Sequence, residues 1–422
     1  MPSPRKIRVL LLGYIQGTFL VPFYQHIKRG LPELEVDVCD YCTLAPGGAK
    51  AASEVFSTFL QVPRIRADPP SLVSLARAGF GACLYGRLWR SLAVKPGRMV
   101  HEFSRAAKIG YLQRLITQRT PYNVFHFHMC SSDNAGYIDA LPKGARAICS
   151  FWGSDLLRSH GLYNYWYQTR LLERCDLITI QAPELEEVVL AKFGRHLKPK
   201  IRRCFFPLDE DFYRLMDRLR DDKARRSQFR QFLGADPGMT VVAAGHNGNP
   251  QNNHLAIITA LAGLPPDRKR SLLVVFPMTY GAHAEHQAAV RRAATDAGLN
   301  FRVLTDYVEA EQVALLRLTC DILIHVPVSD ALCWTGLETM YAGNVLLAGS
   351  WLPYSPYRRA GVPYQVVDEI PELTAVLTSL WPRLNECKKE MDASRDRFRS
   401  HFFPEQTSRA WIEAYRSLAN CQ

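Results

Sequence analysis

The chain has 422 residues, which is long for one domain and enough for two domains that each bury a core. Apolar residues make up 47% and charged residues 22% of it, as in soluble globular proteins, and the formal net charge is +12. No apolar run is long enough to span a membrane, and the first apolar run is too short for a signal peptide. The sequence therefore predicts a cytoplasmic protein.

The first half of the chain alternates strands with helices. Short apolar runs predict strands at 7–13, 36–39, 124–128, 145–152 and 177–181. Apolar residues at helical spacing predict helices at 21–28, 163–174 and 183–193. This alternation is typical of a parallel sheet covered by helices on both faces.

A basic segment, residues 71–120, lies between the second and third of these strands. It holds one acid, Glu102, and nine cations: Arg77, Arg87, Arg90, Lys95, Arg98, Arg105, Lys108, Arg114 and Arg119. With its interleaved aromatic residues it suits an anionic membrane surface, at the inner face of the plasma membrane. A solvated face with arginine side chains lying along apolar surface explains it equally well. Membrane is favoured over nucleic acid, and no nucleic acid is expected as a partner.

Polar side chains occur on or after two of the predicted strands. His126 and His128 alternate along 124–128, so they share one face, and a core position is the simpler interpretation of such a pair. Asp155 follows the strand at 145–152, in Trp152-Gly153-Ser154-Asp155. There it either caps the next helix or takes a proton as a general base.

No metal site and no cofactor are predicted. The 11 cysteines are scattered, mostly inside apolar segments, as expected of reduced buried thiols. Cys39 and Cys42 form a C-x-x-C without a second pair of ligands. The D-x-D of Asp209 and Asp211 lies in a charged stretch rather than at a strand end.

The second half repeats the alternation after a charged stretch, 209–237, that is the best linker candidate. Strands are predicted at 240–244, 272–277, 301–304, 321–326 and 344–349, and helices at 254–261, 284–297, 310–319 and 335–342. The predicted fold class is α/β, with two doubly wound Rossmann-like domains at 1–208 and 238–403 that face a central cleft. A last helix within 404–422, with Trp411, Tyr415 and Leu418 on one face, is expected to pack back on the first domain.

Residues 241–261 carry the most specific local pattern. A buried strand leads into a loop of glycines and small amides, residues 245–254, and then into a helix that Asn252 or Asn253 is placed to cap. Unpaired N–H groups and the helix dipole converge on an anion in such a place, so the loop is a candidate phosphate site. The simpler alternative is that Gly and Asn merely form turns.

Three short motifs resemble one glycosyltransferase family. They are the stretch from Trp152 to Leu156, the G-x-x-G-x-x-x-N-x-H of residues 245–254, and Pro277-Met278-Thr279-Tyr280. In this order they resemble the TDP-N-acetylfucosamine:lipid II N-acetylfucosaminyltransferase family, which has the GT-B fold. Asp330 and Glu338 also form a D-x7-E variant of the E-x7-E motif of retaining GT-B families.

The resemblance implies roles for the residues of these motifs. It implies a UDP- or TDP-linked sugar donor and a lipid-linked or polysaccharide acceptor. Asp155 would be the base of an inverting transfer, with His128 in reserve, and Gly13, Gln16, Gly17 and Trp152 would lie on the acceptor side. Donor-binding residues would be Gly245, His246, Asn247, Gly248, Asn249, Asn253, His254, Tyr280, Asp330 and Glu338.

Each second-half candidate also has a purely structural interpretation. A carboxylate such as Glu338 can accept bonds from a ribose diol, or it can simply interact with the helix dipole. Asp330 either binds sugar hydroxyls or caps a turn, and Tyr280 either contacts the nucleotide or belongs to the core or rim. Four other functions stay open: a retaining transferase that uses Asp330 and Glu338, a non-catalytic sugar-nucleotide-binding protein, an epimerase, and a nucleic-acid-binding protein suggested only by the net charge.

Overall fold

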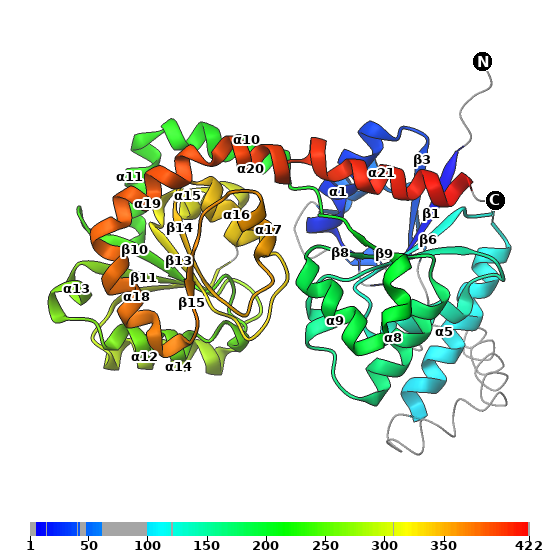
Figure 1. Ribbon diagram of the computed structural model, residues 1–422, viewed down its shortest axis with the longest axis horizontal. Coiled ribbons are helices and arrows are strands. Elements are labelled where there is room, and N and C mark those ends of the chain that lie inside the picture. The colour runs from blue at the N-terminus through cyan, green and yellow to red at the C-terminus, as the bar shows by residue number, and fades with distance from the viewer. Residues whose placement is uncertain are drawn as a thin grey trace. The chain divides into compact units, whose positions relative to one another are not determined.

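The computed structural model describes residues 6–13, 15–39, 41–42, 48–60, 99–119, 121–306 and 308–420. The chain divides into two compact units, the first made of residues 1–207 and 407–422 and the second of residues 208–406. Each unit is a parallel sheet with helices on both faces (Figure 1). The predicted fold class is thereby confirmed.

The first unit is built on a seven-stranded sheet. In spatial order its strands are β5 (Thr58–Leu60), β3 (Leu34–Cys39), β1 (Ile7–Gly13), β6 (Val124–His128), β7 (Arg146–Ser150), β8 (Leu177–Ile180) and β9 (Ile201–Arg203). A separate pair joins β2 (Ile15–Gln16) to β4 (Tyr41–Cys42). The register places Gly13 beside His128 and His128 beside Ser150, so the carboxyl ends of β1, β6 and β7 meet at one edge.

Helices and short turns connect these strands. The longer helices are α1 (Gly17–Gly30), α2 (Gly48–Val55), α5 (Met99–Thr117), α8 (Leu162–Arg174) and α9 (Pro183–Phe193). The shorter ones are α6 (Ser132–Ala135), η2 (Gly136–Ala140), α7 (Ser154–Leu157) and η3 (Arg195–Lys200). The edge strands β5 and β9 were not predicted, because three residues are too few to show a periodic pattern.

The last helix, α21 (Pro404–Asn420), packs against the first unit from Thr407 onward. Trp411 and Tyr415 are fully buried. Trp411 Nε1 donates to the backbone carbonyl of Phe205 at 2.7 Å, and the Tyr415 hydroxyl lies 2.6 Å from His126 Nδ1. The C-terminal helix is therefore part of the core of the first unit.

The second unit is built on a six-stranded sheet. In spatial order its strands are β12 (Asn300–Leu304), β11 (Leu272–Pro277), β10 (Thr240–Ala244), β13 (Ile322–His325), β14 (Val345–Gly349) and β15 (Gln365–Val367). The chain runs outward from β10 to β12 and then returns to the other side of β10. The carboxyl ends of β10 and β13 therefore flank a topological switch point, where open α/β sheets bind their ligands.

Helices cover both faces of this second sheet. α12 (His254–Ala262), α14 (Ala284–Asp296) and α18 (Leu373–Leu380) lie on one face, and α10 (Glu210–Asp221), α11 (Lys223–Leu233) and α15 (Ala310–Thr319) on the other (Figure 1). The remaining helices are η4 (Pro250–Asn252), α13 (Pro266–Arg270), α16 (Trp334–Tyr341), α17 (Ser355–Arg359), η5 (Ile370–Glu372), η6 (Trp381–Arg383), α19 (Leu384–Ala393) and α20 (Arg395–Phe402). The four central strands are almost entirely buried, which explains their continuous apolar runs.

Residues 209–237, the linker candidate, instead form α10 and α11 within the second unit. Asp209 caps α10 by accepting N–H groups of Asp211 and Phe212, and Asp222 caps α11 by accepting that of Arg225. Gly234 ends α11 in the left-handed conformation, at φ +84°. Charged residues here mark the exposed faces of capped helices rather than a connecting segment.

The membrane-binding candidate, residues 71–120, falls largely outside the described residues, which begin again at residue 99. In the described part Arg105 is buried, pairs with Asp133 at 2.7 Å and stacks 4.1 Å over the Tyr167 ring. Arg105 therefore does not belong to an exposed basic face. No helix among the described residues is long and apolar enough to cross a bilayer.

Candidate functional site

The glycine–asparagine loop, residues 245–254, leaves β10 at the switch point of the second sheet. Gly245 has φ +72°, and a Cβ there would lie 2.9 Å from His254 Nε2, so only glycine fits without strain. The Gly245 N–H donates to the Ile324 carbonyl at 2.9 Å, which ties the loop to the neighbouring strand β13. The local pattern of strand, loop and helix therefore forms as predicted.

Asn247 holds the loop in its conformation. Its Oδ1 accepts hydrogen bonds from Asn249 N at 2.9 Å and from Asn252 Nδ2 at 2.8 Å. With Oδ1 accepting both, its Nδ2 donates to His246 Nε2 at 2.8 Å. The side chain is 8% exposed, so it supports the loop mainly from within.

Gly248 sits where the loop touches the segment after β11. Its N–H donates to the Tyr280 carbonyl at 2.8 Å, and a Cβ on it would lie 2.2 Å from the Cβ of Ala282. Tyr280 itself is 60% exposed, so its ring is available to a ligand. The two predicted motifs at 245–254 and 277–280 are thus brought into contact.

The start of α12 differs from the sequence prediction in its capping. Asn253 occupies the N-cap position at φ +58°, but its side chain makes no capping bond and donates instead to the Val326 carbonyl at 2.7 Å. Asn249 caps the short η4 helix by accepting from Gln251 N at 3.1 Å. The first-turn N–H groups of α12 are therefore not occupied by the N-cap side chain, which suits an anion there.

The buried His325 and the partly exposed Asp330 form a pair across the switch point from the loop. His325 Nε2 lies 2.8 Å from Asp330 Oδ2, and Asp330 Oδ1 accepts the Ala331 N–H at 2.8 Å. Burial lowers the pKa of His325, but the Cys333 sulfur and the Asp330 carboxylate outweigh it and raise that pKa to about 10. Burial raises the pKa of Asp330, but the hydrogen bond and charge of His325 lower it by more, so its pKa is below the usual value. The pair is therefore ionic.

His246 stands next to this pair and is neutral. Its ring centroid is 5.2 Å from that of His325. Burial, followed by the charge of His325, lowers the pKa of His246 to about 3. Burial also lowers the pKa of His254, to about 4, and its Nδ1 lies 3.1 Å from His286 Nε2.

Glu338 is already paired inside the protein. α16 begins at Trp334, one residue earlier than predicted, so Glu338 is its fifth residue and lies just beyond the first turn. Glu338 Oε2 accepts from Arg317 Nε at 2.8 Å, and Arg317 Nη2 donates to Thr335 Oγ1 at 3.2 Å. Both side chains are nearly buried, with 14% and 9% exposure.

Arg317 is a site residue that the sequence analysis missed. It lies in α15, close enough to affect the pKa values of His246 and Tyr280, and its Nε and Nη2 are engaged by the neighbouring helix. Its positive charge is balanced by the Glu338 carboxylate. The signal in the sequence is an arginine inside the apolar run 313–318. Burying a cation costs free energy unless it has a charged partner, so such an arginine indicates a buried ion pair.

One group of potential metal ligands occurs among the described residues. His246, His325 and Cys333 each offer an atom, and these three atoms lie within 4.8 Å of one another. The residues are far apart in the sequence and match no ligand spacing, which is why no metal site was predicted.

His126 and His128 share one face of β6, as their alternation predicts, with ring centroids 3.9 Å apart. Trp152 Nε1 donates to His128 Nδ1 at 3.3 Å, and the Tyr24 hydroxyl lies 3.0 Å from His128 Nε2. Burial lowers the pKa of His128 to about 3, so its ring is neutral. The lone pair on Nδ1 already accepts the hydrogen bond from Trp152. His128 as a base remains a prediction, and it would require Trp152 to move.

Asp155 is held by the backbone around it. Its carboxylate accepts the N–H groups of Cys130 at 2.6 Å, Trp152 at 2.9 Å and Gly153 at 3.0 Å. It is 3% exposed. The side chain therefore ties the start of α7 to the loop after β6, and its role as a base also remains a prediction.

The acceptor-side candidates gather at the same sheet edge. Gly13 ends β1, Gln16 lies in β2 beside Cys42, and Gly17 begins α1. Trp152 follows β7 and contacts the rings of Phe19 and Phe206, with centroids 5.8 and 4.9 Å away. Trp152 thus lies beside Phe19 of α1, and the acceptor-side role of these residues remains a prediction.

We expect Asp155→Asn to lower the free energy of unfolding by about 1–3 kcal/mol at about pH 4, because an amide NH₂ would face backbone donors. Burial raises the pKa of Asp155 to about 6, above the value of about 4 in unfolded chains. Its contribution to stability is then fully present below about pH 4 and is lost as the pH rises through about 6. The difference between wild type and variant, measured by urea unfolding, should therefore widen on acidification. If the difference in unfolding free energy narrowed on acidification, the three N–H donors would lower the pKa of Asp155 by more than burial raises it.

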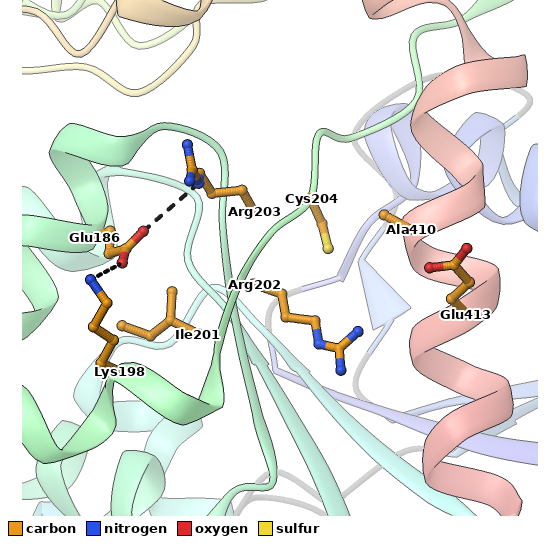
Figure 2. A pocket seen from close by; sticks show the side chains of 8 residues that line it. All are labelled: Glu186, Lys198, Ile201, Arg202, Arg203, Cys204, Ala410 and Glu413. Carbon is orange, nitrogen blue, oxygen red and sulfur yellow. Dashed lines mark ion pairs between the residues drawn. The ribbon is translucent and has the colours of Figure 1, made fainter.

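A cavity lies at the outer edge of the first sheet (Figure 2). It has a volume of about 430 Å³ and lies beside β9 and α21, with Arg202 and Glu413 in its wall. Glu186 pairs there with Lys198 at 3.5 Å and with Arg203 at 3.8 Å. It includes none of the predicted site residues.

Two parallel α/β units in one chain, each with its candidate residues at the carboxyl ends of central strands, define the GT-B fold class. No protein-family model matches the chain, and no curated protein does. Solved structures do match it. The chain is similar to Anabaena HepE in complex with UDP-glucose, with a TM-score of 0.70 and 13% identity over 97% of this chain and 100% of that one.

Two further structures cover the chain as fully. One is the Burkholderia multivorans α,α-trehalose 6-phosphate synthase, with a TM-score of 0.68 and 11% identity over 99% of each chain. The other is WaaG, a glycosyltransferase involved in lipopolysaccharide biosynthesis, with a TM-score of 0.62 and 13% identity over 96% of this chain and 99% of that one. At these identities the similarity establishes the fold.

Proposed function

We propose that this protein is a glycosyltransferase that moves a sugar from a UDP- or TDP-linked donor to a lipid-linked or polysaccharide acceptor in surface-glycan synthesis. The observation that carries the proposal is the glycine–asparagine loop, held by Asn247 at the switch point of the second sheet, directly before α12. A diphosphate is the ligand that this placement favours. The complex of the similar HepE structure with UDP-glucose supports the same assignment.

The donor would be held by backbone and side-chain groups together. Most N–H groups of the loop are used inside the protein, namely those of Gly245, Gly248, Asn249, Gln251, Asn252 and Asn253. The diphosphate would therefore be bound by the N–H groups of His246 and Asn247 and by the first-turn N–H groups of α12. Preorganised donors of this kind stabilise the negative charge that grows on a leaving phosphate. The exposed ring of Tyr280 would contact the nucleotide.

A retaining transfer is the second candidate, and one observation favours it. Asp155 and His128, the bases proposed for an inverting transfer, both have their acceptor atoms engaged by protein donors. In the second unit, Asp330 pairs with His325, whose ring lies 5.2 Å from that of His246 in the loop, and Glu338 pairs with Arg317, so both acids are ionic. The anomeric configuration of the product, read by NMR, separates the two mechanisms.

We expect UDP or dTDP to raise the melting temperature of the protein, whereas GDP and CDP should have smaller effects. A nucleotide that binds only the folded state at about 100 times its Kd stabilises it by about 2.7 kcal/mol. Asn247→Ala should abolish the shift, because the loop loses three hydrogen bonds. A thermal-shift panel with the four nucleotides measures this.

The matched control is Arg202→Ala, which alters the separate cavity beside β9 and should leave the shift unchanged. A shift that depends on Arg202 rather than Asn247 would place the nucleotide elsewhere, and no shift with any nucleotide would contradict the proposal.

Release of free nucleotide from a donor and acceptor mixture distinguishes a transferase from a non-catalytic binding protein. Product analysis without acceptor tests for an epimerase.

A further inference from the structure

We propose that His246, His325 and Cys333 form a binding site for a thiophilic divalent transition-metal ion such as Zn²⁺. The three residues come from separate segments: His246 from the loop after β10, His325 from the end of β13, and Cys333 from the N-cap of α16. One potential ligand atom from each lies within 4.8 Å of the other two. The fold thus brings one sulfur and two imidazoles to a single point at the switch of the second sheet.

The chemistry of this donor set selects the class of metal. Imidazole nitrogen and thiolate sulfur are ligands of Zn²⁺, with bond lengths of about 2.0–2.1 Å and 2.3 Å, whereas Mg²⁺ and Ca²⁺ require oxygen. Two nitrogens and one sulfur on a common tetrahedral ion are about 3.3–3.6 Å apart, so the ligand atoms need to approach one another by about 1.5 Å at most. Three protein ligands leave the fourth position to water or to another small ligand.

His325 is already oriented as a metal ligand. Its Nε2 is bonded to Asp330 Oδ2 at 2.8 Å, and the Tyr354 hydroxyl donates to the same oxygen at 3.3 Å. Its Nδ1 is buried and makes no hydrogen bond among the described residues, and the whole side chain is 0% exposed. Metal binding at Nδ1 would release the proton that the imidazolium carries there. A carboxylate on one imidazole nitrogen and a metal on the other is the usual arrangement around protein-bound zinc.

His246 is the ligand that would have to give up a hydrogen bond in order to bind the metal. Because Asn247 Nδ2 donates to its Nε2, His246 carries its proton on Nδ1, which is also buried without a hydrogen-bond partner among the described residues. A metal on Nε2 would displace the Asn247 donor. A metal on Nδ1 would move the proton to Nε2, where it would meet that donor. Either way, metal binding has to break the hydrogen bond between Asn247 Nδ2 and His246.

The test uses Co²⁺, a spectroscopic substitute for Zn²⁺ in tetrahedral sites, added to the metal-free full chain. We expect one tightly bound Co²⁺ with a thiolate-to-metal charge-transfer band, which added Zn²⁺ should abolish by displacement. Cys333→Ser should remove the band, and Asp330→Asn should weaken binding about 10- to 100-fold through His325. Zn²⁺ should also raise the melting temperature of the wild type but not of Cys333→Ser.

The matched control is Cys320→Ser, which removes another buried thiol of the second unit that is outside the cluster. Its band and affinity should equal those of the wild type. A band that survives in Cys333→Ser, or the absence of any band in the folded wild type, would overturn the proposal. Nucleotide binding is not used in this test, so its outcome is independent of the proposed glycosyltransferase activity.

Discussion

Gly248→Val should lower nucleotide affinity at least about 100-fold, which is about 2.7 kcal/mol of binding free energy. A Cβ at this position would lie 2.2 Å from Ala282 Cβ and 2.9 Å from Ala282 Cα, and backbone atoms cannot move aside as a flexible side chain can. The loop must then leave the Tyr280 carbonyl to which the Gly248 N–H donates. Isothermal titration with UDP and dTDP measures the loss.

A compensating pair of changes shows whether the steric contact is the cause. Gly248→Ala alone should weaken binding, and Gly248→Ala combined with Ala282→Gly should recover part of it, since the closest contact joins the two Cβ atoms. Circular dichroism should report unchanged secondary structure in all three variants, because the contact lies in a loop. Normal affinity in Gly248→Val would show that the glycine–asparagine loop does not hold the nucleotide.

Glu338→Ala should lower the free energy of unfolding by about 3–5 kcal/mol, the usual cost of removing one partner of a buried ion pair. The change leaves the Arg317 guanidinium buried without its carboxylate. Urea unfolding measures the loss. The control is Glu311→Ala, whose pair with Arg225 is about half exposed and should contribute less than about 1 kcal/mol.

The role of Glu338 in binding is tested in a background that removes the unpaired charge. Replacing both partners by apolar residues, Arg317→Met with Glu338→Leu, should restore much of the stability, because no buried charge is left. If Glu338 holds the ribose, this double variant should bind nucleotide more weakly than the wild type even though its stability is restored. Wild-type affinity in the stable double variant would leave Glu338 a purely structural role.

Local patterns in the sequence predicted the parts of the site that are built from neighbouring residues. The loop after β10 follows from one strand, one run of Gly and Asn, and one helix, all within residues 240–262. His126 and His128 share a face because side chains alternate along any strand. Residues 209–237 carried readable helix signals as well, in the caps Asp209 and Asp222, which their high charge obscured.

The remaining parts depend on which strands become neighbours. Arg317 and Cys333 enter the site only because β13 returns to lie beside β10, on the opposite side from β11, and no local pattern determines that order. The partners of Asp155 and His128 are likewise set by tertiary contacts, through Cys130, Trp152 and Tyr24. Residue types therefore identified the candidate site residues. Which hydrogen bonds their polar atoms make could be seen only in the three-dimensional structure.

The packing of α21 against the first unit has a consequence for synthesis on the ribosome. Residues 208–406 form a contiguous unit that can fold once they have emerged, but the first unit also needs residues 407–422. Until these arrive, the site for Trp411 is unfilled and His126 lacks the Tyr415 hydroxyl. The part of the chain that is translated first is therefore the last to be completed, and a nascent chain that stops short of Thr407 presents an unfinished core to chaperones.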